Sequence, residues 1–404
     1  MTTRRFAIRA ILCAATLAWL CVPSGAGEAP GVTDTEIRVG MSTALTGPAL
    51  ALGQGVKAGV EAQFAEVNAA GGIHGRTLRL VALDDGYEPD RCAPNMRKLT
   101  DEENVFAVIG NVGTPTAIVA VPIANEKKTL LFGAFTGAGV LRKTPPDRYV
   151  INYRASYAEE TATMVNAILD ELKLKPEEIG FFTQNDGYGD AGYQGAIQAL
   201  KTRGYAAAEK LPHGRYTRNT ENVEDGLVAL LDAPVKPRAV IMVGAYKPCA
   251  KFIKLAKDEG LKAVFLNVSF VGSDALDKEL GSGGDGVVVT QVVPHPAAGL
   301  AAVAAFRETM KKHAPQSPQG FVALEGYLSA RIFSEGLKKA GKGLTREGHI
   351  DALEAMGEFD IGTSEKLSLG KTDHQASHTV WPTVLRGSEF VPLKWQELRN
   401  GRDS

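Results

Sequence analysis

Two groups of residues in this chain have the types and the spacing needed to bind a small molecule. The first is Gly113-Thr-Pro-Thr, which closely follows the apolar segment Phe106-Ala-Val-Ile-Gly. Thr114 is suited to cap a helix and Pro115 to occupy its first position, so a helix is predicted to begin here. Free backbone N–H groups at a helix start attract anions, which makes Thr114 a candidate ligand for an anionic group. The alternative is a helix cap without a ligand.

The second group consists of three tyrosines at predicted strand ends or helix starts. They are Tyr157, Tyr188 in Asp186-Gly-Tyr-Gly, and Tyr246 in Gly244-Ala-Tyr-Lys-Pro. An aromatic ring there can cover the apolar part of a ligand while its hydroxyl offers a hydrogen bond. A single such tyrosine is more often a half-buried surface residue, whereas three at corresponding positions favour a shared cleft. Tyr87, after Asp84-Asp-Gly, is a weaker candidate for the rim.

The elements that would position these residues follow a strand-helix alternation. Residues 37–85 predict one βαβ unit: an apolar strand ends at Leu45-Thr-Gly-Pro, a helix of about 18 residues follows, and a second strand ends at Asp84-Asp. Such units build parallel sheets whose strand ends face a crevice for ligands. The alternation continues to about residue 290, residues 298–356 are almost all helical in pattern, and residues 365–393 are strand-like.

Length and pattern together predict more than one domain. Two α/β blocks fit the order of elements, one over residues 33–152 and one over 153–290. Helices after residue 298 are expected to return to the first block, and the last strands to the second. Between the blocks, Asp147-Arg-Tyr-Val-Ile-Asn-Tyr-Arg lacks Gly and Ser, so it is predicted to be an extended crossing strand rather than a flexible linker.

The first 26 residues have the pattern of a secretory signal peptide. Three arginines precede an apolar run of 13 residues, and Ser24-Gly-Ala ends the segment. The run is shorter than the roughly 20 residues that span a bilayer, so cleavage after Ala26 and a periplasmic location are expected. A membrane anchor is one alternative. A lipoprotein modified at Cys21 is another, although Trp19 and Leu20 stand where such a motif needs small residues.

Charge and cysteine content limit the partners. The chain has 46 acidic and 45 basic residues, and loss of the three leader arginines leaves a formal charge of −4. Lys and Arg are spread evenly, which argues against nucleic acid as a partner. Beyond the leader only Cys92 and Cys249 remain. They either form a disulfide or stay separate buried thiols, and the spacing does not decide between the two.

No motif in the chain indicates an enzyme. It lacks a Gly-x-Ser-x-Gly elbow, a phosphate-binding Gly-x-x-x-x-Gly-Lys-Ser/Thr loop and a His-Glu-x-x-His helix. His374 and His378 would share one face of a helix and so hold a metal, but the surrounding Ser, Thr and Val residues favour a strand. We therefore expect no catalytic residue, metal or cofactor.

The chain resembles the extracytoplasmic solute-binding proteins of ABC importers, of the leucine/isoleucine/valine-binding type. The resemblance covers nearly the whole chain after the leader and is carried by Leu45-Thr-Gly-Pro, Asn68-Ala-Ala-Gly-Gly-Ile-His-Gly-Arg, Asp84-Asp, Val108-Ile-Gly, Gly113-Thr-Pro-Thr, Asp186-Gly-Tyr-Gly and Ala323-Leu-Glu-Gly-Tyr-Leu. It implies the type I periplasmic-binding-protein fold, an α/β fold with two Rossmann-like lobes joined by three hinge crossings. Residues 33–152 and 291–362 would form the N-terminal lobe, and residues 153–290 and 363–395 the C-terminal lobe.

The resemblance also implies ligand contacts. In that family a Ser or Thr in the turn after the third strand holds the ligand's carboxylate together with backbone N–H groups, and Thr114 occupies this place. The loop Gly133-Ala-Phe-Thr-Gly-Ala is similar to the segment that binds the amino acid, which implies contacts for Ala134 and Thr136. Phe135 either forms an apolar wall for the ligand or packs into the core.

One departure from the family pattern affects the identity of the ligand. Amino-acid binders place an acidic residue after the strand that here ends Phe265-Leu-Asn, to pair with the ligand's ammonium group. This chain has Ser269 and Phe270 there. A buried ammonium without a partner is costly, so an uncharged or purely anionic molecule fits as well as an amino acid. Asp186 would restore a partner if it faced the cleft.

The expected function is that of the periplasmic solute-binding component of an ABC importer. The ligand would be a branched-chain amino acid, an amide, or an aromatic or aliphatic carboxylate, held between hinged lobes and delivered to a membrane permease. The protein is expected to act as a monomer. The alternative is a ligand-binding sensor subunit that works with a separate signalling kinase.

Overall fold

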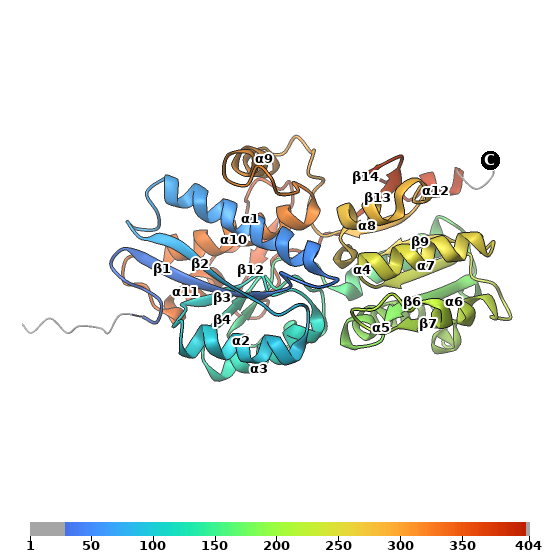
Figure 1. Cartoon of the computed structure of the whole chain (residues 1–404), viewed down its shortest axis with the longest axis horizontal. Helices are drawn as coiled ribbons and strands as arrows, with labels where there is room; N and C mark the ends of the chain where they lie inside the picture. Colours follow the sequence, from blue (N-terminus) through green and yellow to red (C-terminus); the bar gives the residue numbers. More distant parts are fainter. Residues whose placement is uncertain (1–28, 401–404) are drawn as a thin grey trace, which may run out of the picture.

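The computed structural model describes residues 29–400, which form two α/β lobes side by side along the long axis of the molecule (Figure 1). The N-terminal lobe contains a five-stranded parallel sheet in the order β2-β1-β3-β4-β5. Its strands are β1 (Glu36–Thr43), β2 (Thr77–Asp84), β3 (Ala107–Ile109), β4 (Leu130–Phe132) and β5 (Val150–Ile151). The predicted signal peptide, with Cys13 and Cys21, lies outside the described residues.

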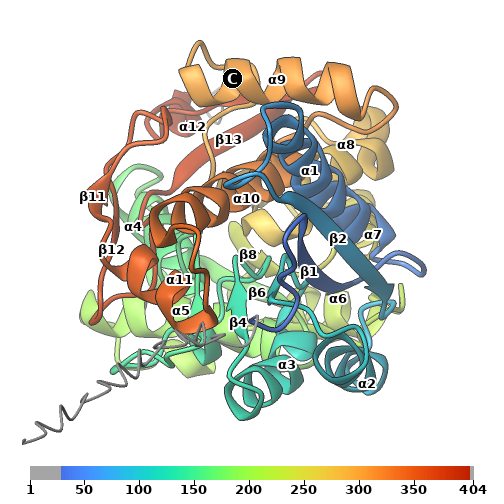
Figure 2. The same ribbon diagram turned by 90° about the vertical axis from the view of Figure 1, so that its left-hand side faces the viewer.

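Helices cover both faces of this sheet. On one face α1 (Leu50–Ala69) packs against α9 (Ala301–His313) and α10 (Phe321–Ala340), and α10 packs on α11 (Arg346–Glu354) (Figure 2). On the other face α2 (Pro89–Asp101) packs against α3 (Thr114–Glu126). Because the sheet is covered on both sides, β3 and β4 are wholly apolar and buried. Gly59 lets α1 and α10 approach closely, since a side chain there would collide with the Ala323 backbone.

The C-terminal lobe contains a seven-stranded sheet in the order β14-β13-β10-β9-β8-β6-β7. Strands β6 to β10 are parallel, whereas β13 and β14 add antiparallel at one edge. The strands are β6 (Ile179–Gln184), β7 (His213–Tyr216), β8 (Ala239–Val243), β9 (Val264–Asn267), β10 (Val288–Gln291), β13 (Trp381–Arg386) and β14 (Glu389–Pro392). The late return of β13 and β14 explains the strand-like pattern near the end of the chain.

The helices of this lobe form two packed groups. α4 packs against α5, while α7 packs against α6 and α8. Their bounds are α4 (Tyr157–Asp170), α5 (Gly187–Thr202), α6 (Glu224–Leu231), α7 (Tyr246–Asp258) and α8 (Ser273–Leu280), and a short α12 (Glu397–Asn400) follows β14. In both sheets the order of strand addition reverses, between β1 and β3 in one lobe and between β6 and β8 in the other. Open α/β sheets bind ligands at the strand ends beside such a reversal.

Segments of extended chain join the lobes. The predicted crossing at residues 147–154 is only partly a strand, because β5 ends at Ile151 and the chain then pairs with a second crossing instead of β4. Asn152 pairs in parallel with Gln375, and the Ser377 N–H donates to the Tyr153 carbonyl at 2.7 Å. A third crossing leads from β10 to α9. The antiparallel pair β11 (Gly357–Phe359) and β12 (Leu367–Leu369) precedes the second crossing.

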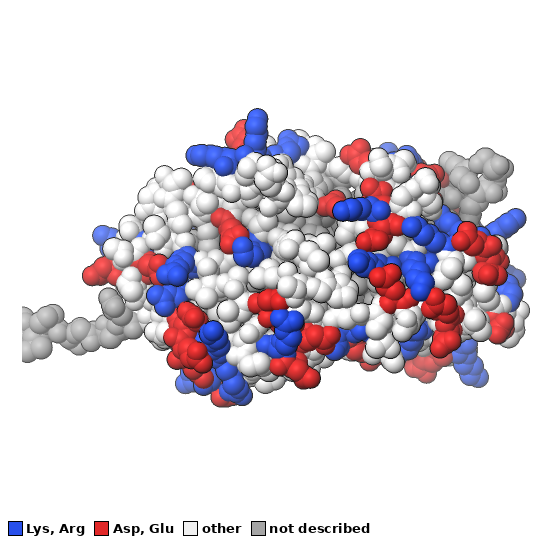
Figure 3. Space-filling view, viewed as in Figure 1, with Lys and Arg blue, Asp and Glu red and all other residues white. Residues whose placement is uncertain are grey.

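The predicted fold class is therefore confirmed: two α/β lobes joined by three crossings. The residue boundaries predicted for the lobes stay a prediction. Cys92 and Cys249 are both free and buried, so the structure contradicts a disulfide between them and agrees with two separate thiols. Among the described residues, no helix has both the length and the apolar character required to cross a bilayer. Acidic and basic side chains are interspersed over the face shown in Figure 3.

Candidate functional site

The turn after β3 brings two threonine hydroxyls together. Thr114 is the first residue of α3, and its Oγ1 lies 2.7 Å from the Oγ1 of Thr136, which follows β4. The prediction that Thr114 caps α3 is wrong, because Gly113 is the N-cap residue at φ +99°. Glycine is required there, since a side chain would collide with the ring of Tyr87. The Thr114 hydroxyl is thus engaged with Thr136 and not with the helix backbone.

The loop after β4 is held by its own backbone. The Phe135 N–H donates to the Asn111 carbonyl at 2.7 Å, and the Thr136 N–H donates to the Ala134 carbonyl at 2.8 Å. The Ala134 side chain packs into the core beneath α2 and α3. Arg142 braces the loop by donating from Nη1 to the Thr136 carbonyl at 3.2 Å. Burial lowers the pKa of Arg142 to about 10, which leaves its guanidinium charged at neutral pH.

An aromatic cluster fills the space between the two lobes. Phe270, in a one-turn 3₁₀ helix after β9, lies at its centre. Its ring centroid is 5.5 Å from that of Phe135, 5.8 Å from that of Tyr87 and 4.5 Å from that of Tyr188, so it joins N-terminal-lobe rings to one from its own lobe. Tyr157 extends the cluster, 5.3 Å from Tyr188. All five side chains are buried.

Helix starts position the tyrosines of this cluster. Tyr157 is the first residue of α4, and Tyr188 lies in the first turn of α5, where its hydroxyl donates to the Gly244 carbonyl at 3.2 Å. Tyr87 was the weaker sequence candidate, predicted at the rim, yet it is fully buried. Its hydroxyl accepts a hydrogen bond from Gln184 Nε2 across the lobes at 3.0 Å.

Tyr246 lies apart from this cluster. It begins α7 as predicted, but the described ring contacts include none between it and the five clustered rings. Its hydroxyl lies beside the Ala51 backbone at the start of α1, in a second line of contact between the lobes. Of the predicted aromatic residues, therefore, Tyr246 is the one that the structure does not bring to the centre.

The centre also contains an arginine that the sequence analysis missed. Arg154 ends the first crossing and is fully buried, with its guanidinium carbon 4.7 Å from the centre of the Phe135 ring. Its Nε lies 3.5 Å from a carboxylate oxygen of Glu325, and its Nη2 lies 3.7 Å from one of Glu160. Nη2 also donates to the Ser269 hydroxyl. Arg154 thus joins α4 and the turn after β9 in one lobe to α10 of the other.

The two carboxylates beside Arg154 differ in their surroundings. Glu160 accepts hydrogen bonds from the Ser269 N–H at 2.8 Å, from the Ser269 hydroxyl at 3.0 Å and from the Thr290 hydroxyl at 2.6 Å. Among the described residues, Glu325 contacts only one charged or hydrogen-bonding group, the Arg154 guanidinium. Burial raises the pKa of Glu325 to about 7, against the opposing effect of Arg154, so this side chain carries a proton for much of the time at neutral pH.

Three polar atoms of this centre have no hydrogen-bond partner among the described residues. They are Nε and Nη1 of Arg154 and the hydroxyl of Tyr157, all without solvent contact. Buried polar groups are nearly always hydrogen-bonded, so each such atom calls for an explanation. The three atoms belong to two neighbouring side chains, since the Arg154 guanidinium carbon lies 4.7 Å from the centre of the Phe135 ring and 5.8 Å from that of the Tyr157 ring.

Asp186, considered from the sequence as a partner for an ammonium group, is committed elsewhere. It is the N-cap residue of α5, accepting from the Tyr188 N–H at 3.0 Å, and it also accepts from Gln184 Nε2 at 2.8 Å. Arg218 donates to it at 3.0 Å. These contacts saturate its carboxylate at the edge of the aromatic cluster.

A polar group of residues closes the rim of the cleft. Arg218, after β7, donates to Glu88 of the other lobe at 2.8 Å and to Asp186 of its own lobe. Asn219 donates to Glu88 at 2.6 Å and to the Gly86 carbonyl at 3.2 Å. The Arg218 and Glu88 side chains remain 23% and 39% exposed, so this contact lies at the surface, unlike that of Arg154.

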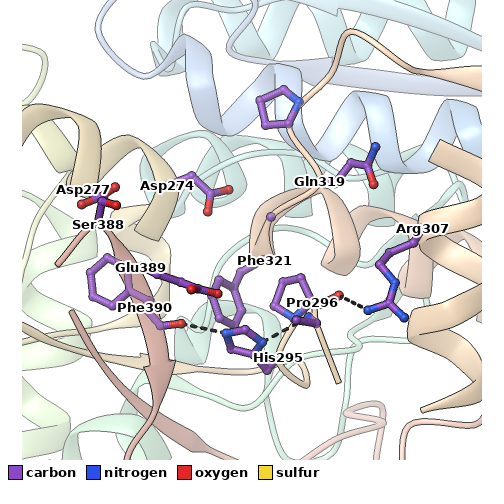
Figure 4. A pocket seen from close by; sticks show the side chains of 13 residues that line it. Asp274, Asp277, His295, Pro296, Arg307, Gln319, Phe321, Ser388, Glu389 and Phe390 are labelled. Atoms are coloured by element: carbon purple, nitrogen blue, oxygen red, sulfur yellow. Dashed lines mark hydrogen bonds between the residues drawn. The ribbon is translucent and has the colours of Figure 1, made fainter. Parts of the chain in front are cut away.

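A separate groove of about 420 Å³ lies beside the third crossing (Figure 4). Its walls include Asp274 of α8, His295 of the crossing, Arg307 of α9 and Phe321 of α10. His295 is tied within it, with Nε2 2.7 Å from the Phe390 carbonyl and Nδ1 accepting from the Ala297 N–H. None of the predicted ligand-binding residues lines this groove.

Over residues 29–400, no group of His, Cys, Asp and Glu side chains has the arrangement of a metal site. His374 and His378 do not share a helix face, since they lie in the second crossing. The ring nitrogens of His374 lie 2.8 Å from the Val150 carbonyl and 3.1 Å from Glu354, whereas His378 contacts Glu159 at 2.6 Å. The His374 ring therefore contacts the first crossing, and the His378 ring contacts α4.

Two α/β lobes, with ring and polar side chains from both meeting at their strand ends, define a two-lobe ligand-binding protein. The chain belongs to the periplasmic binding protein family, whose profile matches residues 36–389. This finding confirms the resemblance inferred from the sequence motifs.

Individual relatives agree with this assignment. The crystal structure of a "possible leucine/isoleucine/valine-binding protein" from Rhodopirellula baltica is 50% identical, covers 92% of this chain and 99% of its own, and superimposes with a TM-score of 0.88. A Leu/Ile/Val-binding protein homolog of Brucella abortus is 26% identical over 64% of this chain and 68% of its own length. A fatty acid ABC transporter substrate-binding protein from Thermomonospora curvata shares the fold, with 23% identity, a TM-score of 0.80, and coverage of 94% of this chain and 97% of its own.

Proposed function

We propose that this protein is the periplasmic solute-binding component of an ABC importer, secreted through a cleaved signal peptide and monomeric. In this proposal it binds a small organic molecule between its lobes and delivers it to a membrane permease. Membership in the periplasmic binding protein family supports the general role. The observation that carries the proposal is the buried cluster of Phe135, Tyr157, Tyr188 and Phe270, which joins the strand ends of both lobes.

The residues proposed to contact the ligand are the sequence candidates together with Arg154. The full set is Thr114, Ala134, Phe135, Thr136, Arg154, Tyr157, Tyr188, Tyr246, Ser269 and Phe270. The hydroxyls of the two threonines would hold an oxygen of the ligand, and the rings would enclose its apolar part. Tyr246 and Ala134 have the weakest support, since one ring lies outside the cluster and the other side chain points into the core.

The relatives do not fix the ligand. Their names refer to branched-chain amino acids in some cases and to a fatty acid in another. The proposed ligand is therefore a branched-chain amino acid, an amide, or an aromatic or aliphatic carboxylate.

The proposed mechanism is hinge closure. The ligand first contacts the Thr114 and Thr136 hydroxyls of the N-terminal lobe, and the C-terminal lobe then rotates over it with Tyr157, Tyr188 and Phe270. Paired extended segments at Asn152 and Gln375 provide a connection that can bend without opening either core. Closure removes water from around the ligand and makes the surface that a permease would recognise.

The experiment combines thermal-shift screening with small-angle X-ray scattering. The mature protein is first unfolded and refolded to remove any solute that co-purifies, and it is then screened against amino acids, amides and carboxylates. A compound that binds should raise the melting temperature and reduce the radius of gyration. If no compound does either, the proposal is wrong.

The double variant Thr114→Ala/Thr136→Ala tests the site itself. We expect the affinity for the best compound to fall about tenfold or more, because the variant loses the paired hydroxyls that face the ligand, while the melting temperature of the free protein changes little. Thr202→Ala removes an exposed hydroxyl that donates to the Gln198 carbonyl on α5 and serves as the matched control. Equal affinities of the double variant and the control would remove the threonines from the site.

A further inference from the structure

We infer that Arg154 receives a carboxylate of the ligand, and that this ligand is an apolar or aromatic carboxylic acid without an ammonium group. The inference rests on the proposed function, because it assumes that a solute binds between the lobes. It goes further in naming the chemical class of that solute and the residue that selects it.

The unpartnered donors of Arg154 are the first observation. Its side chain is fully buried, yet Nε and Nη1 make no hydrogen bond within residues 29–400. A guanidinium offers five N–H donors in a flat fork that matches a carboxylate. Nη2 donates to the Ser269 hydroxyl, and Nε faces a Glu325 oxygen at 3.5 Å without forming a hydrogen bond to it, so Nη1 is the freest of the three nitrogens. Donors without a partner require an acceptor, and a carboxylate is the acceptor that gains most from a buried arginine.

Other groups around the guanidinium complete a site for such an acid. The Tyr157 hydroxyl is also buried and forms no hydrogen bond of normal geometry, although the Thr136 hydroxyl beside it acts to lower its pKa, and its ring centre lies 5.8 Å from the Arg154 guanidinium carbon. On one side the guanidinium lies over the Phe135 ring, which continues into the contact with Phe270. Polar donors therefore meet a wall of rings, as expected for a ligand with an acidic end and an apolar body.

The carboxylates of the region leave no good partner for an ammonium group. Glu160 already accepts three hydrogen bonds besides its contact with Arg154. Asp186 caps α5 and binds Arg218. Glu325 faces Arg154, and its burial favours the protonated form, which attracts a cation weakly. An α-amino acid would therefore bury its ammonium without a free anion, at a large cost.

A purely structural role is the rival explanation for Arg154, because its contacts join the two lobes through Glu325. That role would affect stability and closure for every ligand alike. A carboxylate-binding role would instead distinguish between ligands that differ only in charge. The experiment therefore compares matched compounds and does not depend on one variant alone.

The compounds form two matched series measured by isothermal titration calorimetry. One consists of leucine, 4-methylpentanoate and 4-methylpentanamide, and the other of phenylalanine, 3-phenylpropanoate and 3-phenylpropanamide. Within each series the carbon skeleton is the same, while the ammonium and the negative charge are removed in turn. In at least one series we expect the carboxylate to bind about tenfold or more tightly than both of its relatives.

Three variants accompany these series. Arg154→Lys keeps a positive charge but loses the fork, and Arg154→Met/Glu325→Gln removes the interlobe ion pair while leaving Glu160 without its cation. Arg203→Lys, in an exposed pair with Asp170 on the far part of the C-terminal lobe, is the control. We expect the first two to weaken carboxylate binding about tenfold or more while amide binding changes little, and the control to match the wild type.

The possible outcomes separate the inference from the proposed function. Tighter binding of leucine or phenylalanine than of the matching acid would overturn the inference and leave a solute-binding function intact. Carboxylate binding that does not depend on Arg154 would overturn it too. If neither series binds, the hits of the broad screen decide: an apolar acid supports the inference, and a hit of any other class contradicts it. Failure of every compound to bind would overturn both.

Discussion

Two arginines of this protein each meet two carboxylates and join the lobes, but they do so in different surroundings. Arg154 lies at the centre, where its side chain and those of Glu160 and Glu325 are 1%, 0% and 6% exposed. Arg218 lies at the rim, with Glu88 and Asp186 at 39% and 15% exposure around its own 23%. The rim arginine donates hydrogen bonds to both of its carboxylates and leaves only Nε without a partner among the described residues, whereas the central one hydrogen-bonds neither of its carboxylates and leaves Nε and Nη1 without partners.

The difference shows that an arginine between two carboxylates has different energetic consequences when it is buried and when it is exposed to solvent. At the rim, water screens the charges, so the ion pair contributes little energy, and the protein itself supplies a hydrogen bond to each carboxylate. At the centre, desolvation makes every charge costly and every unpaired donor costly as well. A ligand that completes the central group therefore gains much more than one that contacts the rim.

The largest expected effect is that of Arg154→Met on stability. The substitution leaves Glu160 and Glu325 buried without their cation, and breaking a buried ion pair in this way costs about 3–5 kcal/mol. Arg218→Met should cost less than about 1 kcal/mol, since its contacts are half-exposed. Urea denaturation of the free protein measures both values.

A second substitution at the centre makes that comparison sharper. Adding Glu325→Gln to Arg154→Met should recover part of the loss, because it removes one of the two uncompensated acids. At the rim, adding Glu88→Gln to Arg218→Met should recover nothing measurable. Equal losses at the two sites, or no recovery at the centre, would contradict the view that burial distinguishes them.

The pH dependence of stability should reveal Glu325. Its pKa is about 7 in the folded protein and 4.5 in the unfolded chain, because burial outweighs the effect of Arg154, while Glu160 raises the pKa and Arg142 lowers it. Between these pH values the folded state holds a proton that the unfolded state has released. Stability should therefore fall as pH rises from 4.5 to 7, by up to about 3 kcal/mol, and level off above.

The measurement is a set of urea denaturation curves for the wild type and Glu325→Gln between pH 4.5 and 8. The variant lacks the titrating group, so its stability should fall less over this range. Glu335→Gln, on the same helix and exposed beside Lys338, is the control and should retain the slope of the wild type. Parallel curves for Glu325→Gln and the wild type would show that the carboxyl group does not hold the proton.

The sequence predicted some of the residues at the centre and missed others. Strand and helix patterns were enough to predict two α/β blocks, because local pattern and the geometry of parallel sheets act over short segments. The resemblance to the binding-protein family pointed to Phe135 and Phe270, which meet in the structure. Arg154 could have been suspected, because it ends the predicted crossing and Glu159 and Glu160 follow within two turns.

The parts that could not be predicted depend on contacts between distant segments. Glu325 belongs to the motif Ala323-Leu-Glu-Gly-Tyr-Leu, which carries the family resemblance. Its contact with Arg154 depends on α10 meeting the end of the first crossing, which the sequence does not reveal. Tyr246 occupies a helix start like Tyr188, but its ring lies against α1 and outside the cluster. The capping role of Thr114 was wrong, since Gly113 takes that position to make room for Tyr87.

The smallest expected effect is at the rim, and it should appear in binding more than in stability. Arg218 is held within its own lobe by Asp186, so it is ready to meet Glu88 when the lobes close. Under the proposed hinge closure, that contact forms when the lobes close and contributes nothing to the fold of a separate lobe. We expect Arg218→Gln to weaken ligand binding about two- to fivefold, mainly by faster release.

Stopped-flow release of the best compound measures this effect, at low and at high salt. Because the pair is exposed to solvent, the difference in release rate between the variant and the wild type should fall to about zero near 1 M salt. At that salt concentration charges are screened from one another beyond about 3 Å. Arg203→Gln, which breaks an exposed pair inside one lobe, should release ligand at the wild-type rate. A salt-independent effect of Arg218→Gln would mean that the rim residue contacts the ligand directly. It would contradict the view that the ligand is bound at the centre and that the rim only holds the lobes together.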